Sequence, residues 1–302
     1  MPKISVVIPT KDRLRYLQRA ISMFLSFEEV GQVVVVIDGC RDGTLEYVKE
    51  LALNDARLQY VDNVQNRGLP YSRNAGNDLA ECEYVFTAED DLELTDGFFK
   101  TLLAHMHESS ADVISGRNIF RLETETVGDA IRRTDNLQGP AVNSRLVTVQ
   151  TGFPAIDDQQ QLLLPSPMLA RRSLFREIRF DDGYRVNFWR EESDFQLSAF
   201  EKGYKLVFCP HAISLNLVIE NDRSGVHAVA GVRRAKWVVK NNWRFIAKHR
   251  KVIEDEFNVG SFYYYIASFA VRRVFLDVVA PILVRTKRKV LTVRRAGRRL
   301  TE

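Results

Sequence analysis

The stretch "QVVVVIDGCRDGTLEYVKELAL", residues 32–53, decides the fold class of this chain. Its five consecutive β-branched residues indicate a strand that is buried on both faces, because a half-exposed strand would alternate apolar and polar residues. An Asp-Gly turn follows, and apolar residues then recur at helical spacing as far as Leu53. A buried strand that leads through a turn into an amphipathic helix is typical of an α/β fold.

The same alternation extends to both sides of this stretch. Apolar runs predict further strands at 4–9, 58–62 and 84–88, and helical periodicity predicts helices at 13–27 and 70–80. Together these elements imply a parallel sheet with helices on both faces. Open sheets of this kind bind ligands beyond the carboxyl ends of their strands. The segments that follow each strand are therefore the first places to look for a site.

Those segments are rich in Asp, Gly, Asn and Thr, and they contain neither a GxGxxG fingerprint nor a GxxxxGK[ST] loop. A dinucleotide-binding Rossmann enzyme and a P-loop NTPase therefore lose their main sequence support. The fourth strand ends in three consecutive acids, Glu89, Asp90 and Asp91. A divalent cation would relieve their repulsion, since Mg²⁺ binds carboxylate and diphosphate oxygens. Spacing alone leaves a solvated acidic turn equally open.

Length and composition are those of a globular protein: 302 residues, 45% of them hydrophobic, suffice for one large domain with an appendage or for two domains. The three cysteines, Cys40, Cys82 and Cys209, are odd in number and form no CxxC pair. They indicate neither a disulfide framework nor a structural zinc site, so we expect a reducing, cytosolic compartment. The short apolar run at the start is too short for the core of a signal peptide and predicts a first strand.

Charge is distributed unevenly. Residues 223–302 contain 19 Lys and Arg against five acids, whereas residues 1–222 carry a net charge of −10. The pattern predicts an acidic body with a basic extension that meets an anionic surface, either a membrane or nucleic acid.

The extension combines cations with aromatic residues. Residues 232–251 interleave aromatic side chains with eight Lys and Arg, and the apolar stretch that follows is interrupted by Arg272, Arg273, Asp277 and Pro281. This stretch is a poor membrane span, so an interfacial segment on an anionic membrane surface, within residues 232–299, is favoured. A helical subdomain over the core or a homodimer contact stays open, and nucleic acid is disfavoured because no known binding motif is present.

Five segments in order resemble the successive motifs of the family 2 glycosyltransferases: "SVVIPTKDR", "VVVIDGCRDGT", "NRGLPYSRNAG", "YVFTAEDD" and "SPMLARRSLFREIRFDDGYRVNFWREESDFQLSAFEKGYKLVFCP". The resemblance covers about residues 3 to 217. It implies the nucleotide-diphospho-sugar transferase (GT-A) fold, a Rossmann-like α/β fold with a mixed sheet flanked by helices. Its nucleotide-binding half would be residues 1–100 and its acceptor half 101–222, followed by the basic helical extension 223–302.

The resemblance also assigns donor-binding roles. It implies that seven residues contact the nucleoside or diphosphate of the donor: Pro9, Thr10, Asp12, Asp38, Arg73, Glu89 and Asp90. As alternatives, Asp38 would cap its own turn and Arg73 would be a surface arginine of its helix. A divalent cation, Mg²⁺ or Mn²⁺, is expected on Asp91, with Asn216 at a position where the family often has a histidine. His211 and His227 are the alternatives for that further ligand.

The segment "WREESDF" resembles the part of the family that contains the catalytic base. The resemblance places Glu192 as base, Glu191 as its support and Asp194 close behind, in an inverting transfer. The alternative is a charged helix N-terminus, where acids favourably meet the helix dipole. UDP is the expected donor nucleotide because it is the commonest among relatives. The expected acceptor is a glycan or a lipid-linked sugar at the inner face of the plasma membrane.

Several further expectations complete the sequence-based picture. The processive-synthase motif Gln-x-x-Arg-Trp is missing, so one sugar is expected per encounter. Residues 121–165 are expected to form irregular acceptor-side loops. Two rival functions remain: a sugar-nucleotide nucleotidyltransferase, disfavoured because "PTKDR" does not resemble its Gly-rich loop, and a catalytically silent protein with the same fold that binds glycan or nucleotide.

Overall fold

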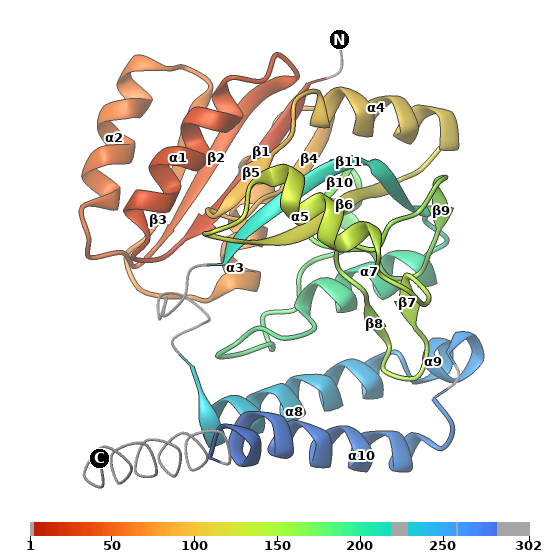
Figure 1. Ribbon diagram of the computed structural model, residues 1–302. Coiled ribbons are helices and arrows are strands. Elements are labelled where there is room, and N and C mark those ends of the chain that lie inside the picture. Colours follow the sequence, from red (N-terminus) through yellow and green to blue (C-terminus); the bar gives the residue numbers. More distant parts are fainter. Residues whose placement is uncertain (1–2, 219–228, 258, 283–302) are drawn as a thin grey trace, which may run out of the picture.

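The structure is a computed structural model that describes residues 3–218, 229–257 and 259–282 (Figure 1). Predictions on His227 and on residues 283–302 of the extension lie outside the described residues. The strands are β1 (Ile4–Thr10), β2 (Val30–Asp38), β3 (Leu58–Asn63), β4 (Tyr84–Thr87), β5 (Leu92–Leu94), β6 (Val113–Leu122), β7 (Val142–Asn143), β8 (Thr148–Val149), β9 (Gln159–Gln160), β10 (Met168–Arg171) and β11 (Leu206–Val218).

Most of these strands form one sheet. Helices flank that sheet and add a layer below it in the view of Figure 1. They are α1 (Leu14–Leu25), α2 (Thr44–Asn54), α3 (Leu69–Leu79), α4 (Phe98–Ser109), α5 (Val127–Asp135), α6 (Leu174–Glu177), α7 (Glu191–Glu201), α8 (Gly231–Lys248), α9 (Arg250–Glu256), α10 (Phe262–Val274) and the π-helical turn η2 (Phe275–Val279).

The main sheet has the order β3-β2-β1-β4-β10-β6-β11-β5, with β9 paired to β11. Strands β1 to β4 pair in parallel, which confirms the parallel arrangement predicted for the first hundred residues. Strand β10 lies antiparallel between β4 and β6 and makes the whole sheet mixed. The carboxyl ends of β1, β2 and β4 therefore meet at one edge, as an open α/β sheet requires.

Alternate residues of the strands build two cores. Val6 and Ile8 of β1 belong to the core beneath α1 and α4, whereas Val7 faces the core that α6 and α7 cover. Helix α3 packs closely over Val7, because a Cβ on Gly76 would lie only 2.4 Å from its Cγ1. This glycine lets α3 lie close to the sheet, near the edge where the strands end.

One element contradicts the expected irregular loops of residues 121–165. Helix α5 occupies Val127–Asp135, and Thr126 caps it in a capping box with Asp129. The spacing of this Thr and Asp was a usable helix-start signal. The remainder of that segment begins with the last two residues of β6 and otherwise contains the short strands β7, β8 and β9.

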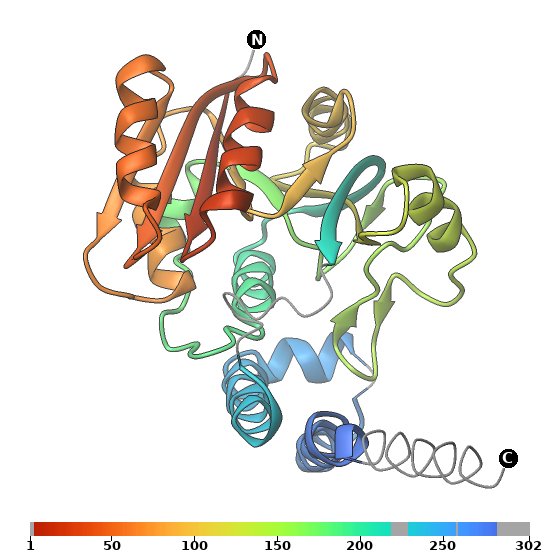
Figure 2. The same cartoon turned by 60° about the vertical axis from the view of Figure 1, so that its left-hand side comes forward.

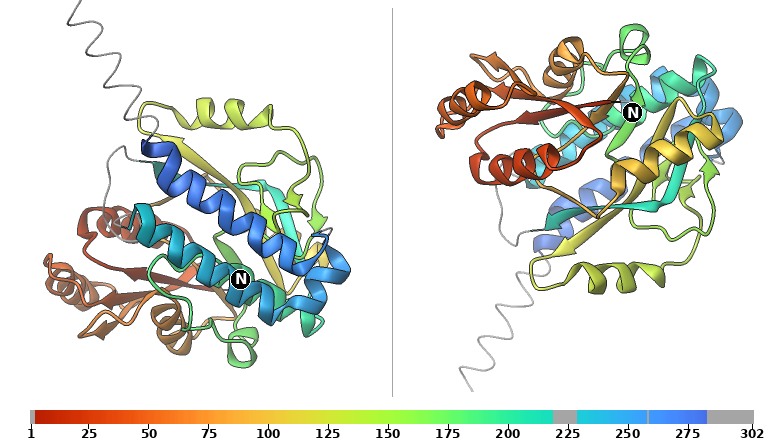
Figure 3. Two further views of the ribbon diagram at one scale, coloured as in Figure 1. Left: turned by 90° about the horizontal axis from the view of Figure 1, so that it is seen from below. Right: turned by 90° about the horizontal axis from the view of Figure 1, so that it is seen from above.

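Helices α8 and α10 lie side by side and form the additional layer, here called the helix layer (Figures 1 and 3). Phe245 and Ile246 of α8 and Tyr265 of α10 share a buried core with Leu197 of α7 and Val147, which precedes β8. The layer is thus continuous with the part of the chain that contains α7. Among the described residues, no helix is both long and apolar enough to cross a membrane. All three cysteines are free, as predicted.

Candidate active site

The acid cluster, Glu89, Asp90 and Asp91, lies between β4 and β5 at the carboxyl edge of the sheet. Thr10, the last residue of β1, donates its hydroxyl to Asp90 Oδ2 at 2.8 Å. Arg13, which directly precedes α1, lies 3.0 Å from Asp90 Oδ1 and 2.7 Å from Asp91 Oδ2. The buried side chain of Arg13 therefore offsets part of the repulsion between the neighbouring acids of the cluster.

Two acids of the cluster converge on one amide. Asn216 of β11 donates its Nδ2 to Glu89 Oε2 at 2.7 Å and to Asp91 Oδ1 at 3.2 Å. Its own Oδ1 accepts from Asn118 Nδ2 at 2.7 Å, so the amide turns its nitrogen rather than its oxygen to the acids. The sequence prediction needs the opposite orientation, in which the Asn216 oxygen faces a cation.

Burial and like charge raise the pKa values of two acids in this cluster, Glu89 and Asp90. Desolvation, followed by the charges of Asp91 and Glu192, raises the pKa of Glu89 to about 8. Desolvation raises the pKa of Asp90 to about 7, although Arg13 opposes the shift. Positive charge near Glu89 and Asp91 is therefore strongly favoured, because it would relieve both burial and repulsion.

Arg73 of α3 joins the cluster to the acids at the start of α7. Its guanidinium is buried and donates from Nε to Glu191 Oε1 at 3.1 Å and from Nη2 to Glu192 Oε1 at 2.7 Å. Ser166 also donates to Glu192 Oε1, at 2.5 Å. The surface-arginine alternative for Arg73 is wrong. The residue instead fixes the position of Glu192, which is a quarter exposed, while Glu191 is buried.

A single guanidinium here faces three carboxyl groups. Burial raises the pKa of Glu191 to about 8, with Arg73 opposing the shift and Glu192 and Glu89 adding to it. Desolvation acts against the charge of Arg73, but the carboxyl groups, led by Glu191, raise its pKa overall. The arrangement therefore holds a proton on Glu191 at neutral pH and leaves Glu192 as the accessible acid of the pair.

Arg190, which the sequence analysis missed, supports this acid pair from the other side. It directly precedes α7, and its buried side chain donates to Asn242 Oδ1 at 2.9 Å, to Leu146 O at 3.0 Å and to Val147 O. The guanidinium also lies 4.7 Å from the centre of the Phe245 ring. Arg190 thus ties the start of α7 to the β7–β8 segment and to the helix layer.

The backbone before the acid pair is strained. Val186, Phe188 and Arg190 have positive φ angles of 71°, 51° and 80°. Such angles are unfavourable for bulky and β-branched residues and persist only where the surrounding structure holds them. Arg190 supplies part of that restraint, since its side chain bonds to the β7–β8 segment and to α8.

Other predicted site residues lie in separate contacts. Asp194 is fully buried and accepts from Tyr184 Oη at 3.0 Å and from Lys248 Nζ at 2.7 Å, with His249 Nε2 at 3.0 Å. It therefore joins α7 to the helix layer rather than to the acid cluster. His211 likewise stacks on His105, with ring centres 5.0 Å apart.

The predicted nucleoside residues lie at the ends of β1 and β2, where Pro9 precedes Thr10. Asp38 accepts from the backbone N–H groups of Arg67 at 2.7 Å and Gly68 at 2.9 Å. It therefore orders the loop before α3 and does not cap its own turn. Asp12 is exposed and accepts from Arg41 N at 2.7 Å. Desolvation acts to raise the pKa of Asp12, but the hydrogen bonds and positive charges of Lys11 and Arg41 outweigh it and lower that pKa.

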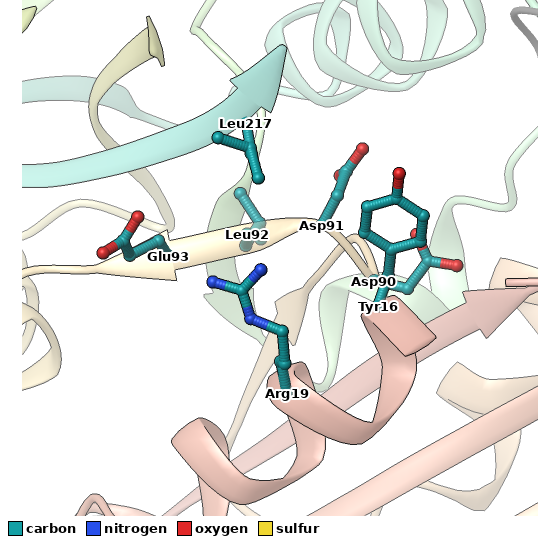
Figure 4. A pocket seen from close by; sticks show the side chains of 7 residues that line it. All are labelled: Tyr16, Arg19, Asp90, Asp91, Leu92, Glu93 and Leu217. Atoms are coloured by element: carbon teal, nitrogen blue, oxygen red, sulfur yellow. The ribbon is translucent and has the colours of Figure 1, made fainter. Parts of the chain in front are cut away.

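A small pocket opens beside the acid cluster, on the side of α1 (Figure 4). Figure 4 shows the Tyr16 ring beside Asp90 and Asp91, and Arg19 extending from α1 towards β5. The lining residues are Tyr16, Arg19, Asp90, Asp91, Leu92, Glu93 and Leu217. An arginine and a tyrosine hydroxyl next to carboxylates make this pocket suited to a polar, charged ligand.

Two carboxylates of the cluster, those of Glu89 and Asp91, are donors of the kind that a hard divalent cation binds, whereas Asn216 presents its nitrogen to them. Oxygens of Glu89 and Asp91 point at one electropositive atom, Asn216 Nδ2, so the protein already places a partial positive charge where they converge. Mg²⁺ and Mn²⁺ prefer carboxylate oxygens of this kind.

Arg13 and Arg190 were not predicted as site residues, because their sequence contexts indicate such a role only weakly. Arg13 belongs to the quoted "PTKDR" and Arg190 to "WREE", but an arginine near acids is common on protein surfaces. Neither sequence context shows which carboxylates or carbonyls the guanidinium meets, because those partners come from distant segments.

Comparisons with known proteins point to one family. The family model described as Glycosyl transferase family 2 matches residues 5–179. Glycosyltransferase GlyG of Streptococcus pneumoniae is 25% identical over 227 residues, which cover 74% of this chain and 71% of that protein. The GalNAc(5)-diNAcBac-PP-undecaprenol beta-1,3-glucosyltransferase of Campylobacter jejuni is 34% identical over 116 residues, 37% of each chain.

Two solved structures share the fold. GalNAc-T7, crystallised with UDP, GalNAc and Mn²⁺, has a TM-score of 0.66 at 13% identity and covers 94% of this chain, which spans 58% of that one. The mannosyltransferase PcManGT of Pyrobaculum calidifontis, in complex with GDP-Man and Mn²⁺, has a TM-score of 0.59 at 15% identity. Its match covers 96% of this chain and 80% of that one. At these identities the likeness shows the fold alone.

Proposed function

This chain belongs to glycosyl transferase family 2 and is a glycosyltransferase, and from that premise we propose that it transfers one sugar, with inversion, from a nucleoside diphosphate sugar to a glycan or lipid-linked acceptor. The observation that carries the proposal is the contact of Arg73 with Glu191 and Glu192. Glu89 of the acid cluster interacts electrostatically with both Arg73 and Glu192, so the proposed base and the proposed diphosphate site would share one edge.

Glu192 is the proposed general base. Its Oε1 is already held by Arg73 and Ser166, and it is the more exposed acid of the pair. In the reaction, the acceptor hydroxyl gives its proton to Glu192 while its oxygen forms a bond to the anomeric carbon of the donor. The bond from that carbon to the diphosphate oxygen breaks on the opposite face, and the nucleoside diphosphate leaves with the electron pair.

Glu89 and Asp91 are the proposed holders of a divalent cation, with Asn216 at their convergence point. When bound, such a cation supplies Lewis-acid neutralisation of the diphosphate. Structures with this fold that hold UDP or GDP-Man also contain Mn²⁺, which supports the choice of Mn²⁺ or Mg²⁺. Arg13 is placed to keep Asp90 and Asp91 in position.

The remaining donor contacts are proposed by position. Pro9, Thr10, Asp12 and Asp38 follow β1 and β2, where the nucleoside of an open α/β sheet is expected. Asp38 would act through the loop before α3, whose backbone it already binds. UDP is the proposed nucleotide, and a lipid-linked acceptor is suggested by the undecaprenol-linked sugar in the name of the Campylobacter relative.

Thermal shift is the first test. We expect UDP with Mn²⁺ to raise the melting temperature of the wild type, and Asp91→Asn to abolish the metal-dependent part. Asp62→Asn is the matched control, since Asp62 lies exposed near the end of β3. The same measurement with GDP, dTDP and CMP shows which nucleotide base the protein prefers. If none of these nucleotides stabilises the wild type in the presence of Mn²⁺ or Mg²⁺, the donor site is not where we propose it.

A further inference from the structure

The outward side of α10 and η2 is unusually apolar. Tyr263, Tyr264 and Val271 are 69%, 72% and 71% exposed, and they continue into further exposed apolar residues: Val274, Phe275, Leu276 and Val279. The inward side of the same helix, with Phe262, Tyr265 and Phe269, is buried. A helix that is apolar on both sides normally has both sides covered.

The same two helices also expose cations. Arg233, Lys236 and Lys240 are exposed on α8, together with Trp243, and Arg272 is exposed on α10. Figure 3, in its left-hand view from below, shows α8 and α10 side by side across the front of the molecule. We call the exposed residues of these two helices the outer face of the helix layer. It combines an apolar strip, aromatic side chains and positive charge.

The composition of the sequence that follows α10 and η2 favours one occupant of this face. Residues 285–299 contain eight Lys and Arg and no acid. A second copy of the chain would bring cations against cations, which is unfavourable. An anionic lipid surface instead complements the charge, accepts the apolar strip, and suits tyrosine and tryptophan at headgroup depth.

We propose that the outer face of the helix layer binds the surface of an anionic lipid bilayer, with α8 and α10 lying parallel to the membrane plane. The interaction is peripheral: the apolar strip enters the headgroup boundary, and the cations contact lipid phosphates. This inference concerns a surface outside the transfer site and does not depend on the identity of donor or acceptor.

Docking in this way would turn the active site towards the membrane. Figure 2 shows the arrowheads of β1 and β2 pointing to the side of the molecule on which the helix layer lies. The start of α7 is tied to that layer through Arg190 and Asn242. The acid pair is therefore held at a fixed position relative to the docking face, as an enzyme with a lipid-linked acceptor would require.

Cosedimentation with vesicles tests the proposal. The full chain is incubated with vesicles of phosphatidylcholine alone and of an equal mixture with phosphatidylglycerol, at low and high salt. The test variant combines Tyr264→Ser, Val271→Ser and Phe275→Ser. The matched control combines Leu53→Ser, Val64→Ser and Ile156→Ser, which removes three comparably exposed apolar side chains elsewhere. Melting temperatures confirm that both variants fold.

We expect the wild type and the control to bind the phosphatidylglycerol vesicles, and high salt to weaken that binding. The test variant should partition about a hundredfold more weakly. Three results would overturn the proposal: no binding of the wild type to anionic vesicles, equal binding to neutral ones, or binding of the test variant at wild-type strength. Loss of a dimer in the test variant, without any lipid binding by the wild type, would assign the face to a second copy.

Discussion

The two sides of the α7 N-terminus are each held by a buried arginine, but the two arginines have opposite kinds of partner. On the sheet side, Arg73 meets two carboxyl groups, those of Glu191 and Glu192. On the side of the helix layer, Arg190 meets two backbone carbonyls and the amide oxygen of Asn242. We conclude that the sheet side supplies the reactive charges and the other side supplies the rigid support. The predictions below test that division, from the largest effect to the smallest.

The largest effect is expected on the sheet side. Glu192→Gln keeps an oxygen for Arg73 and Ser166 but removes the proton acceptor, so kcat should fall about a thousandfold with little change in melting temperature. Sugar transfer under saturating donor measures it. Glu46→Gln, in the first turn of α2, is the matched control and should be fully active. An active Glu192→Gln enzyme would move the base to another residue.

A smaller effect, on stability rather than chemistry, is expected from Arg190→Met. The substitution leaves the Val147 carbonyl and the Asn242 amide oxygen without this donor, while Leu146 O keeps only Tyr265, so the free energy of unfolding should fall by about 3 kcal/mol. Denaturant unfolding measures this loss.

Arg244→Met is the control for that experiment, because Arg244 lies on α8 in an exposed pair with Asp181. It should cost about 0.5 kcal/mol. Nucleotide affinity of folded Arg190→Met should stay unchanged. If Arg190→Met has normal stability but no longer binds nucleotide, Arg190 belongs to the donor site. That result would contradict the division of roles between Arg73 and Arg190.

The charge balance of the sheet side predicts a pH dependence. Folded Glu191 has a pKa of about 8 against an ordinary value of 4.5, so the folded state holds the extra proton between these pH values. The free energy of unfolding should therefore fall as pH rises from about 5 to about 8. In Glu191→Gln the fall should be smaller by about 3 kcal/mol, measured by denaturant unfolding at several pH values.

Glu89 and Asp90 also titrate in this range, but they do so in both proteins and largely cancel in the difference. Glu46→Gln again serves as control, and its free energy of unfolding should depend on pH in the same way as that of the wild type. If Glu191→Gln shows the wild-type dependence as well, Glu191 is ionised in the folded protein and Arg73 neutralises it fully.

The smallest effect concerns one hydroxyl that supports Arg190. Tyr265 donates to Leu146 O at 3.0 Å and its oxygen lies 3.5 Å from Arg190 Nη2. Tyr265→Phe should lower the free energy of unfolding by about 1 kcal/mol. Tyr263→Phe, two residues earlier and exposed, should have no measurable effect. Equal effects of the two changes would show that the hydroxyl contact adds nothing to the support.

By itself, the sequence determined the strand and helix alternation of residues 4–88, because buried parallel strands and amphipathic helices leave distinct periodicities. It also brought Thr10 and the acid cluster to one edge, since parallel strands end together. The helix α5 was within reach of sequence reasoning through its capping box, but the abundance of Gly and Pro around it favoured a loop.

Tertiary structure alone decided which charges face one another. Nothing local distinguishes Asp194, which turns into the helix layer, from Glu192, which turns to Arg73 two residues earlier. Likewise only the fold shows that Asn216 presents its nitrogen to the acids, because Asn118 on a neighbouring strand takes its oxygen. Side-chain partners are set by contacts between distant segments, and a sequence fixes periodicity and strand ends more directly than it fixes those contacts.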